Sequence, residues 1–203
     1  IIIMQKYYKN IIYILFIIVI IFTFIYIFVK LSTISNKNIV GHDKLKNIYG
    51  EPLKPCQINN NSENKGSWDD KGYCSELDGG VHQICFNVNN DTSDFSSKTG
   101  QSNWSEDRIG NNHCMCLGAW ALYKAKNEGT DKELQCESIP EIALSENYVK
   151  NWNKWNGNEL PDQIIKGVDS LVKQCHNKKS SDYLKNNYDK LRNTYNSDWE
   201  SIL

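Results

Sequence analysis

Seven cysteines, all between positions 56 and 175, constrain the fold of this 203-residue chain. Two of them form a Cys-x-Cys pair, Cys114 and Cys116, which ends a short apolar run and leads into a predicted amphipathic helix, with one face buried and one exposed. On a strand, residues two apart point to the same face, so we expect the two thiols side by side. A direct disulfide between them would close a small strained ring, so we expect separate partners. Cys74 and Cys85 are the first candidates, followed by Cys56.

Four interpretations of the cysteines remain open. They are buried structural thiols, structural disulfides, a metal site, or a redox-active Cys-x-Cys pair with a depressed thiol pKa. Thiolates with an imidazole suit zinc, although no Cys-x-x-Cys knuckle is present. The candidate ligands are Cys74, His82, Cys85, Cys114 and Cys116. The odd count leaves at least one thiol unpaired, and we expect this to be Cys175, on an apolar helical stripe.

His82 is the candidate for acid–base chemistry, because the pKa of imidazole lies near neutrality. A histidine beside a buried strand is also commonly a hydrogen-bonded structural residue. The candidate catalytic residues are therefore Cys114, Cys116 and His82, with no reaction assigned. The chain has no phosphate-binding glycine loop, nucleophile elbow or zinc-protease signature.

A hydrophobic run from Ile11 to Val29 contains no charged residue. Its nineteen residues would rise about 28 Å as a helix, close to the hydrocarbon thickness of a bilayer. It is longer than a signal-peptide core and lacks a small-residue cleavage site. We therefore expect a single-pass transmembrane helix in contact with the lipid bilayer. The flanking lysines give no decisive orientation, and the cysteines slightly favour a soluble domain on the non-cytosolic side.

Strands and helices follow the run without regular alternation, which favours an α+β fold. Apolar segments predict strands at 81–88, 113–117 and 133–137. Helical periodicity predicts helices at 119–127 and 145–155, and two amphipathic tail helices with apolar positions at 164–175 and 184–202. The predicted architecture is a small mixed-sheet domain with flanking helices, an N-terminal transmembrane helix and a C-terminal helical hairpin.

The predicted divisions follow from these patterns. They are an N-terminal tail at 1–10, the transmembrane helix at 11–29, a linker at 30–46, a Cys-rich α+β domain at 47–157 and the helical hairpin at 158–203. The net charge of −1 gives no basic excess for binding nucleic acid.

Several motifs occur together in a characteristic order. They are Asn47-Ile-Tyr-Gly-Glu-Pro-Leu-Lys-Pro-Cys56, Gly72-Tyr-Cys74, Gly80-Val-His-Gln-Ile-Cys85, Phe95-Ser-Ser-Lys-Thr-Gly100, and Cys114-Met-Cys116 before a Trp-containing helix. Together they resemble the uncharacterised "domain of unknown function 2237" family over about residues 47–155. The resemblance implies a compact α+β domain and supplies no activity. The family usually has Trp where this chain has His113, so a role for His113 would be particular to this protein.

The leading functional prediction is a membrane-anchored Cys-rich domain that binds a protein or small-molecule partner and needs no cofactor. The alternative is an enzyme that uses the Cys/His cluster as a zinc site or as a thiol–disulfide exchange centre.

Overall fold

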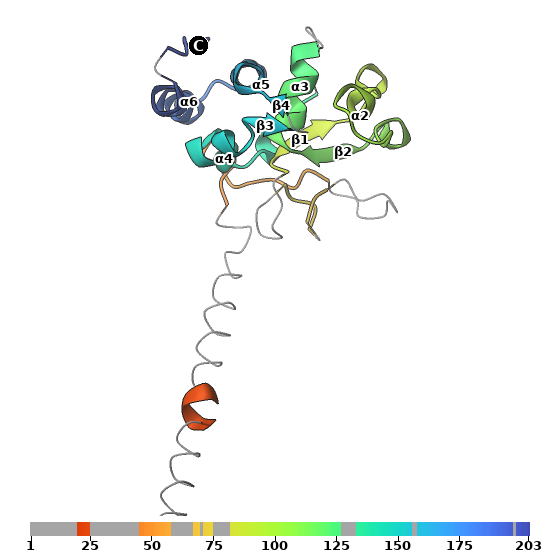
Figure 1. The fold of residues 1–203 in the computed structure, drawn as a ribbon. Coiled ribbons are helices and arrows are strands. Elements are labelled where there is room, and N and C mark those ends of the chain that lie inside the picture. The colour runs from red at the N-terminus through yellow and green to blue at the C-terminus, as the bar shows by residue number, and fades with distance from the viewer. Residues whose placement is uncertain are drawn as a thin grey trace, which may run out of the picture. The chain divides into compact units, whose positions relative to one another are not determined.

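The computed structural model describes residues 20–24, 45–57, 67–69, 71–74, 82–126, 133–155, 158–196 and 198–203. The chain divides into two compact units, residues 1–40 and 41–203. The second unit contains short helices and strands together with two longer helices at its C-terminal end (Figure 1). Its shorter helices include η2 (Asn90–Thr92), η5 (Glu141–Leu144) and α4 (Glu146–Asn151). The mixed content confirms the predicted α+β composition.

A two-stranded antiparallel sheet organises the second unit. In it β1 (Ile84–Asn87) pairs with β2 (Asn112–Met115). The register places Cys85 opposite Cys114, and Phe86 opposite His113. Because successive side chains of a strand point to opposite faces, the two cysteines share one face of the sheet. Phe86 and His113 share the other face.

The outer edge of β1 is covered by residues 133–135. Leu134 forms an isolated bridge with Phe86, and Gln135 N donates to Cys85 O (3.0 Å). The chain then enters the 3-10 helix η4 (Cys136–Ser138), so the predicted third strand is reduced to this bridge.

A second short pair joins β3 (Lys154–Trp155) to β4 (Asn158–Glu159), and it is also antiparallel. The prediction of a mixed sheet is therefore wrong, because the described strands pair only in antiparallel fashion.

Helix α3 (Leu117–Lys126) lies at the centre of the core, where Trp120 and Tyr123 are fully buried. Both rings meet Phe86 of β1 edge to face, at 6.1 and 6.4 Å between centroids. On another side of the helix, Trp120 Nε1 donates to Gly167 O (3.0 Å). The pattern at 119–127 predicted a helix with an exposed face, but α3 is buried on most sides because other elements cover it.

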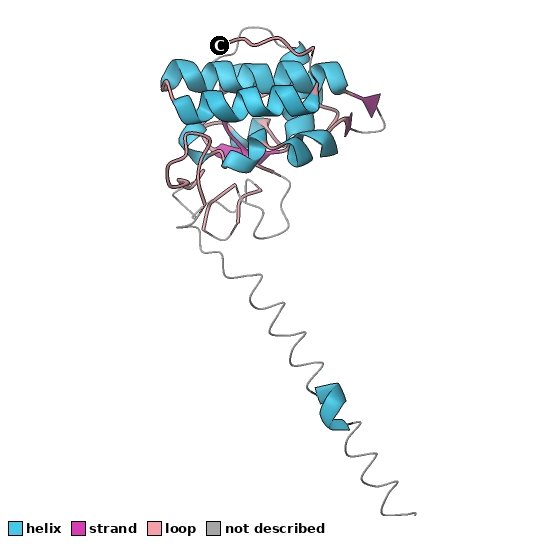
Figure 2. Cartoon of the chain, turned by 90° about the vertical axis from the view of Figure 1, so that its left-hand side faces the viewer, coloured by secondary structure: helices cyan, strands magenta, loops and turns pink. Residues whose placement is uncertain are grey.

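The two long C-terminal helices, α5 (Pro161–Lys178) and α6 (Asp182–Tyr195), lie side by side, as predicted for the tail (Figure 2). A carboxylate links them. Asp169 Oδ1 on α5 accepts from Tyr188 Oη on α6 (2.6 Å) and from Trp199 Nε1 (2.9 Å). These contacts hold the last described residues of the chain against α5.

Three disulfides cross-link the second unit: Cys56–Cys85, Cys74–Cys114 and Cys136–Cys175. Cys116 is the free cysteine. The expectation that Cys175 is unpaired is wrong, because packing of α5 brings its Cα to 5.6 Å from that of Cys136 on η4. Three disulfides are typical of proteins that fold in an oxidising compartment.

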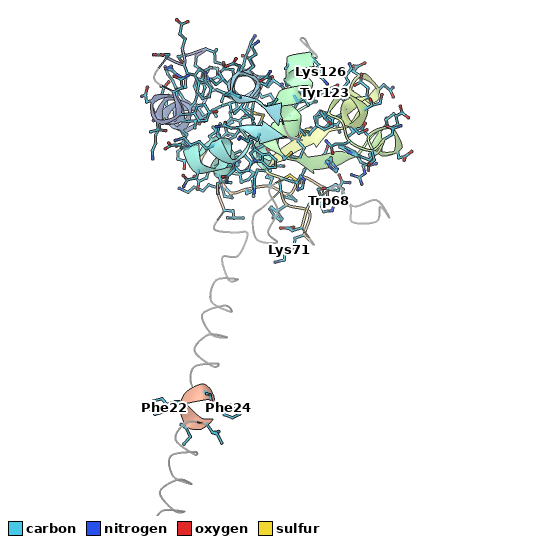
Figure 3. All side chains as sticks on the ribbon, in the orientation of Figure 1. Phe22, Phe24, Trp68, Lys71, Tyr123 and Lys126 are labelled. Atoms are coloured by element: carbon cyan, nitrogen blue, oxygen red, sulfur yellow. A yellow bond between two sulfur atoms is a disulfide. The ribbon has the colours of Figure 1, made fainter. Side chains whose placement is uncertain are left out.

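The transmembrane helix predicted at 11–29, and the single-pass membrane location predicted from it, need correction. In the part of the chain that the structure describes, no helix is both long enough and apolar enough to cross a bilayer. Within 11–29 the structure describes residues 20–24. Phe22 and Phe24 in this segment are each 68% exposed (Figure 3). The rest of the predicted span lies outside the described residues.

The close approach of α5 to α3 depends on a glycine. A Cβ at Gly167 would lie 2.7 Å from Ala121 Cβ and 2.8 Å from Ala121 Cα. Gly167→Ala should therefore destabilise the domain by about 1–2 kcal/mol, because overpacking outweighs the helix propensity that alanine gains. Urea unfolding measures this, with Lys166→Ala at a neighbouring exposed position as the control. Equal or greater stability of Gly167→Ala would contradict the packing described.

Candidate functional site

The structure places the predicted site residues in two groups. Cys74, Cys85 and Cys114 belong to disulfides at the β1–β2 sheet. His82 and Cys116, by contrast, line a cavity of about 300 Å³. Within the described residues, the potential metal-ligand group comprises Cys56, Cys74 and Cys114. The predicted zinc set is therefore not brought together as a whole.

Cys116 departs from the expected strand geometry. Strand β2 ends at Met115, and Cys116 begins the turn into α3, where Ala119 N donates to Cys116 Sγ (3.4 Å). The expectation that Cys114 and Cys116 point to one face of a strand is wrong, because β2 ends at Met115 and Cys116 lies outside the strand. Cys116 instead lines the same cavity as His113 and Met115.

A cluster of three side chains gives this cavity its polar character. Arg108 Nη1 lies 2.7 Å from His113 Nδ1. The imidazole stacks on the Trp104 indole with ring centroids 4.1 Å apart, and the Arg108 guanidinium carbon lies 5.0 Å from the indole centroid. A guanidinium has donors only, so His113 Nδ1 accepts, and the neutral ring carries its proton on Nε2.

A tight turn brings the cluster together. Arg108 ends the 3-10 helix η3 (Glu106–Arg108), and Gly110, at φ +90°, returns the chain into β2. Gly110 N donates to Val88 O (2.7 Å), which fixes the turn beside β1. This turn allows Arg108 to meet His113 although they are five residues apart.

Hydrogen bonds also position the indole. Trp104 Nε1 donates to Gln101 Oε1 (3.1 Å), and Trp104 N donates to Ser96 Oγ (3.2 Å). Ser96 belongs to α2 (Phe95–Lys98), so the loop that carries Trp104 is attached to a helix of the core.

Burial determines the protonation states in the cavity. Desolvation, with smaller effects from the charges of Arg108 and His82, lowers the pKa of His113 to about 3. Desolvation also lowers the pKa of His82. Burial raises the pKa of Cys116 to about 11, although backbone N–H groups at the start of α3 oppose this. At neutral pH both imidazoles are therefore neutral, the thiol is protonated, and Arg108 supplies the positive charge.

The described lining of the cavity combines hydrogen-bond donors with apolar surface. Polar groups come from Arg108, His82, His113, Gln101 and Ser102, and apolar surface comes from Phe95, Met115 and Ala119. None of the described lining side chains is acidic. Among the described residues, Arg108 forms no ion pair with a carboxylate, although Asp107 is near enough to act on its pKa.

Sequence reasoning missed Trp104 and Arg108, and it treated His113 only as a departure from a family pattern. No periodic pattern relates positions 104, 108 and 113, because a turn separates them. The available signal was local: a glycine at 110, two residues after the arginine and three before the histidine.

Comparisons with known proteins leave the chain without an assigned relative. No protein-family model matches it, and neither a curated protein nor a solved structure matches it. The resemblance to the "domain of unknown function 2237" family therefore has no support from these comparisons and stays a prediction.

The buried imidazole of His113 should make stability depend on pH. Below pH 6.5 the unfolded chain protonates this ring, whereas the folded chain does so only near pH 3. The contribution is therefore complete above pH 6.5 and is lost as the pH falls, by about 2 kcal/mol between pH 7 and pH 5. In urea unfolding, His113→Gln should remove about that much of the pH dependence. His176→Gln, on α5, is the control and should retain it; an unchanged slope in His113→Gln would contradict the assignment.

Cys116 should be a slow nucleophile in the folded chain. Its pKa is raised from 9.0 to about 11, so at neutral pH the thiolate fraction is about one hundredth of that of an unperturbed cysteine. The side chain is also buried. Alkylation by iodoacetamide, followed by mass spectrometry on the oxidised chain, should be at least a hundredfold slower in buffer than in denaturant. Rapid labelling in buffer would show an exposed or activated thiol.

Proposed function

We propose that this chain is a disulfide-stabilised binding domain that takes a small carboxylate with an apolar body. The cavity beside β2 is the binding site. One observation carries the proposal: the Arg108 guanidinium is held against His113 and Trp104 in a cavity whose described lining has no acidic side chain.

Charge favours an anion. Arg108 donates one hydrogen bond to His113, and a guanidinium has further N–H donors in a planar fork that suits a carboxylate. The Nε2–H of His113 makes no hydrogen bond with the described residues, and the ring lines the cavity. His113 is 5% exposed and lines the cavity, so a carboxylate bound there can also accept from its Nε2–H.

Shape favours a small ligand with an apolar part. A volume of about 300 Å³ lies at the lower end of the range for small-molecule sites. Phe95, Met115 and Ala119 offer apolar contact next to the polar groups. A carboxylate attached to a ring or a branched chain matches both parts. For this reason the small-molecule form of the predicted binding module is favoured over a protein partner.

The predicted alternative, a thiol enzyme, has less support. Its nucleophile would need a thiolate, usually generated by a nearby base or a depressed pKa. Cys114 is bonded to Cys74, and burial raises the pKa of Cys116. Burial also lowers the pKa values of both histidines, so an imidazolium that would stabilise a thiolate is disfavoured.

Benzoate and benzamide test the proposal, because they have nearly the same shape and differ in charge. Benzoate should bind the full chain at least tenfold more tightly than benzamide, about 1.4 kcal/mol, because only benzoate can pair with Arg108. NMR titration that follows the indole N–H of Trp104 measures both affinities. Equal affinities, or no binding of either compound, would overturn the proposal.

A pair of variants isolates the role of the guanidinium. Arg108→Gln should weaken benzoate binding at least tenfold while leaving benzamide binding nearly unchanged. Lys185→Gln, at an exposed position on α6, removes the same charge away from the cavity and should bind benzoate like the unmodified chain. If the two variants lose benzoate affinity equally, the effect is one of net charge and Arg108 is not the ligand contact.

A further inference from the structure

Four of the seven cysteines meet on one face of the β1–β2 sheet, away from the proposed anion site. Cys85 and Cys114 lie directly opposite each other on the two strands. Cys85 O accepts from Gln135 N (3.0 Å) on the outer edge of β1, so the backbone polar groups of Cys85 point away from β2. The two cysteines therefore form a non-hydrogen-bonded pair, the kind in which opposite Cα atoms are closest, about 4.5 Å apart.

Two loop segments place the other two cysteines over this pair. Cys56 N donates to Gly72 O (2.7 Å), which joins the segment of Cys56 to the segment of Cys74. The approach requires glycine, since Gly72 has φ +85° and a Cβ there would lie 2.1 Å from Gln57 O. Asn112 Nδ2 also donates to Cys56 O (2.5 Å), which attaches the first loop to β2.

As a result, the sulfur atoms of two separate disulfides are neighbours. The Sγ atoms of Cys56, Cys74 and Cys114 all lie within 4.8 Å of one another, and Cys85 Sγ is bonded to Cys56 Sγ. All four side chains are buried. Cys136 and Cys175, by contrast, form a separate pair, and Cys116 lines the cavity.

We propose that these four cysteines form a second site, which binds one zinc ion when the two disulfides are reduced. Tetrahedral zinc with four thiolates has Zn–S distances of about 2.3 Å, which places the sulfurs about 3.8 Å apart. The Sγ atoms of Cys56, Cys74 and Cys114 lie within 4.8 Å of one another, which is at most about 1 Å beyond that spacing, and those of Cys74 and Cys114 are bonded to each other and therefore closer. Breaking the Cys56–Cys85 and Cys74–Cys114 bonds allows the two sulfurs of each pair to separate to the same distance. Zinc then links the two loops to the β1–β2 sheet in place of the disulfides.

The reaction needs a dithiol reductant. Two molecules of dithiol supply four electrons and four protons, so that the two disulfides become four thiols and the reductant becomes two disulfides. Zinc then displaces the four thiol protons to solvent as the Zn–S bonds form. The zinc-bound state thus retains the cross-links of this face under conditions that remove disulfides.

Pulse alkylation of the unmodified chain tests this site without any substitution. The full chain is reduced with a dithiol, freed of the reductant without oxygen, and treated briefly with iodoacetamide in the presence or absence of zinc chloride. Zinc should slow alkylation of Cys56, Cys74, Cys85 and Cys114 at least tenfold, and should leave Cys136 and Cys175 unchanged. Metal analysis after gel filtration should give one zinc per chain. No retained zinc, or equal protection of Cys136 and Cys175, would overturn the proposal.

Matched variants provide a second test. Cys74→Ser removes one ligand and should weaken zinc binding by the reduced chain at least tenfold, measured by competition with a chromogenic chelator. Cys136→Ser removes a cysteine of the separate disulfide and should bind zinc like the unmodified chain. Equal zinc affinity of these two variants would contradict a site formed by Cys56, Cys74, Cys85 and Cys114. Neither test depends on benzoate binding, so the two proposals stand or fall separately.

Discussion

The antiparallel pairing of β1 with β2 positions both the clustered disulfides and the cavity of the second unit. Its register places Cys85 opposite Cys114 on one face, and Phe86 opposite His113 on the other. The first face receives the loops that carry Cys56 and Cys74, held by disulfides. The second face supplies Phe86 to the aromatic core and His113 to the cavity. A shift of the register by one residue would exchange the faces and separate both groups.

Burial gives the two groups different chemistry. In the cavity, desolvation lowers the pKa of His113 and raises that of Cys116, so both are neutral near pH 7. This environment suppresses nucleophilic and acid–base reactivity and leaves Arg108 as the charged contact for a ligand. On the other face of the β1–β2 sheet, four buried cysteines form two neighbouring disulfides. Cys114 and His113 are adjacent on β2, and their side chains point to opposite faces of the sheet. Each residue therefore belongs to a different group.

Much of the secondary structure could be predicted from local patterns. The β-branched and apolar segment at 81–88 contains β1, and the spacing of Ile164, Val168 and Leu171 corresponds to the buried face of α5. Contacts between distant segments account for the errors. Covering of α3 on more than one side hides the face that its sequence predicts to be exposed. The separation of Cys114 from Cys116 follows from the start of α3 at Leu117, which alternation along a strand does not predict. For the apolar run at 11–29, hydropathy led to a membrane prediction that no described helix supports.

Local sequence patterns are sufficient to predict the α+β composition, the positions of the two strands and the C-terminal helices of this cysteine-rich chain. These properties depend on residue type and on spacing over a few positions, which physical chemistry relates directly to local conformation. Tertiary packing determines which cysteines pair, so that Cys175 is bonded and Cys116 is free. It also brings Arg108, Trp104 and His113 together. Such partnerships depend on how segments far apart in the chain pack. Spacing within one segment contains no record of that packing.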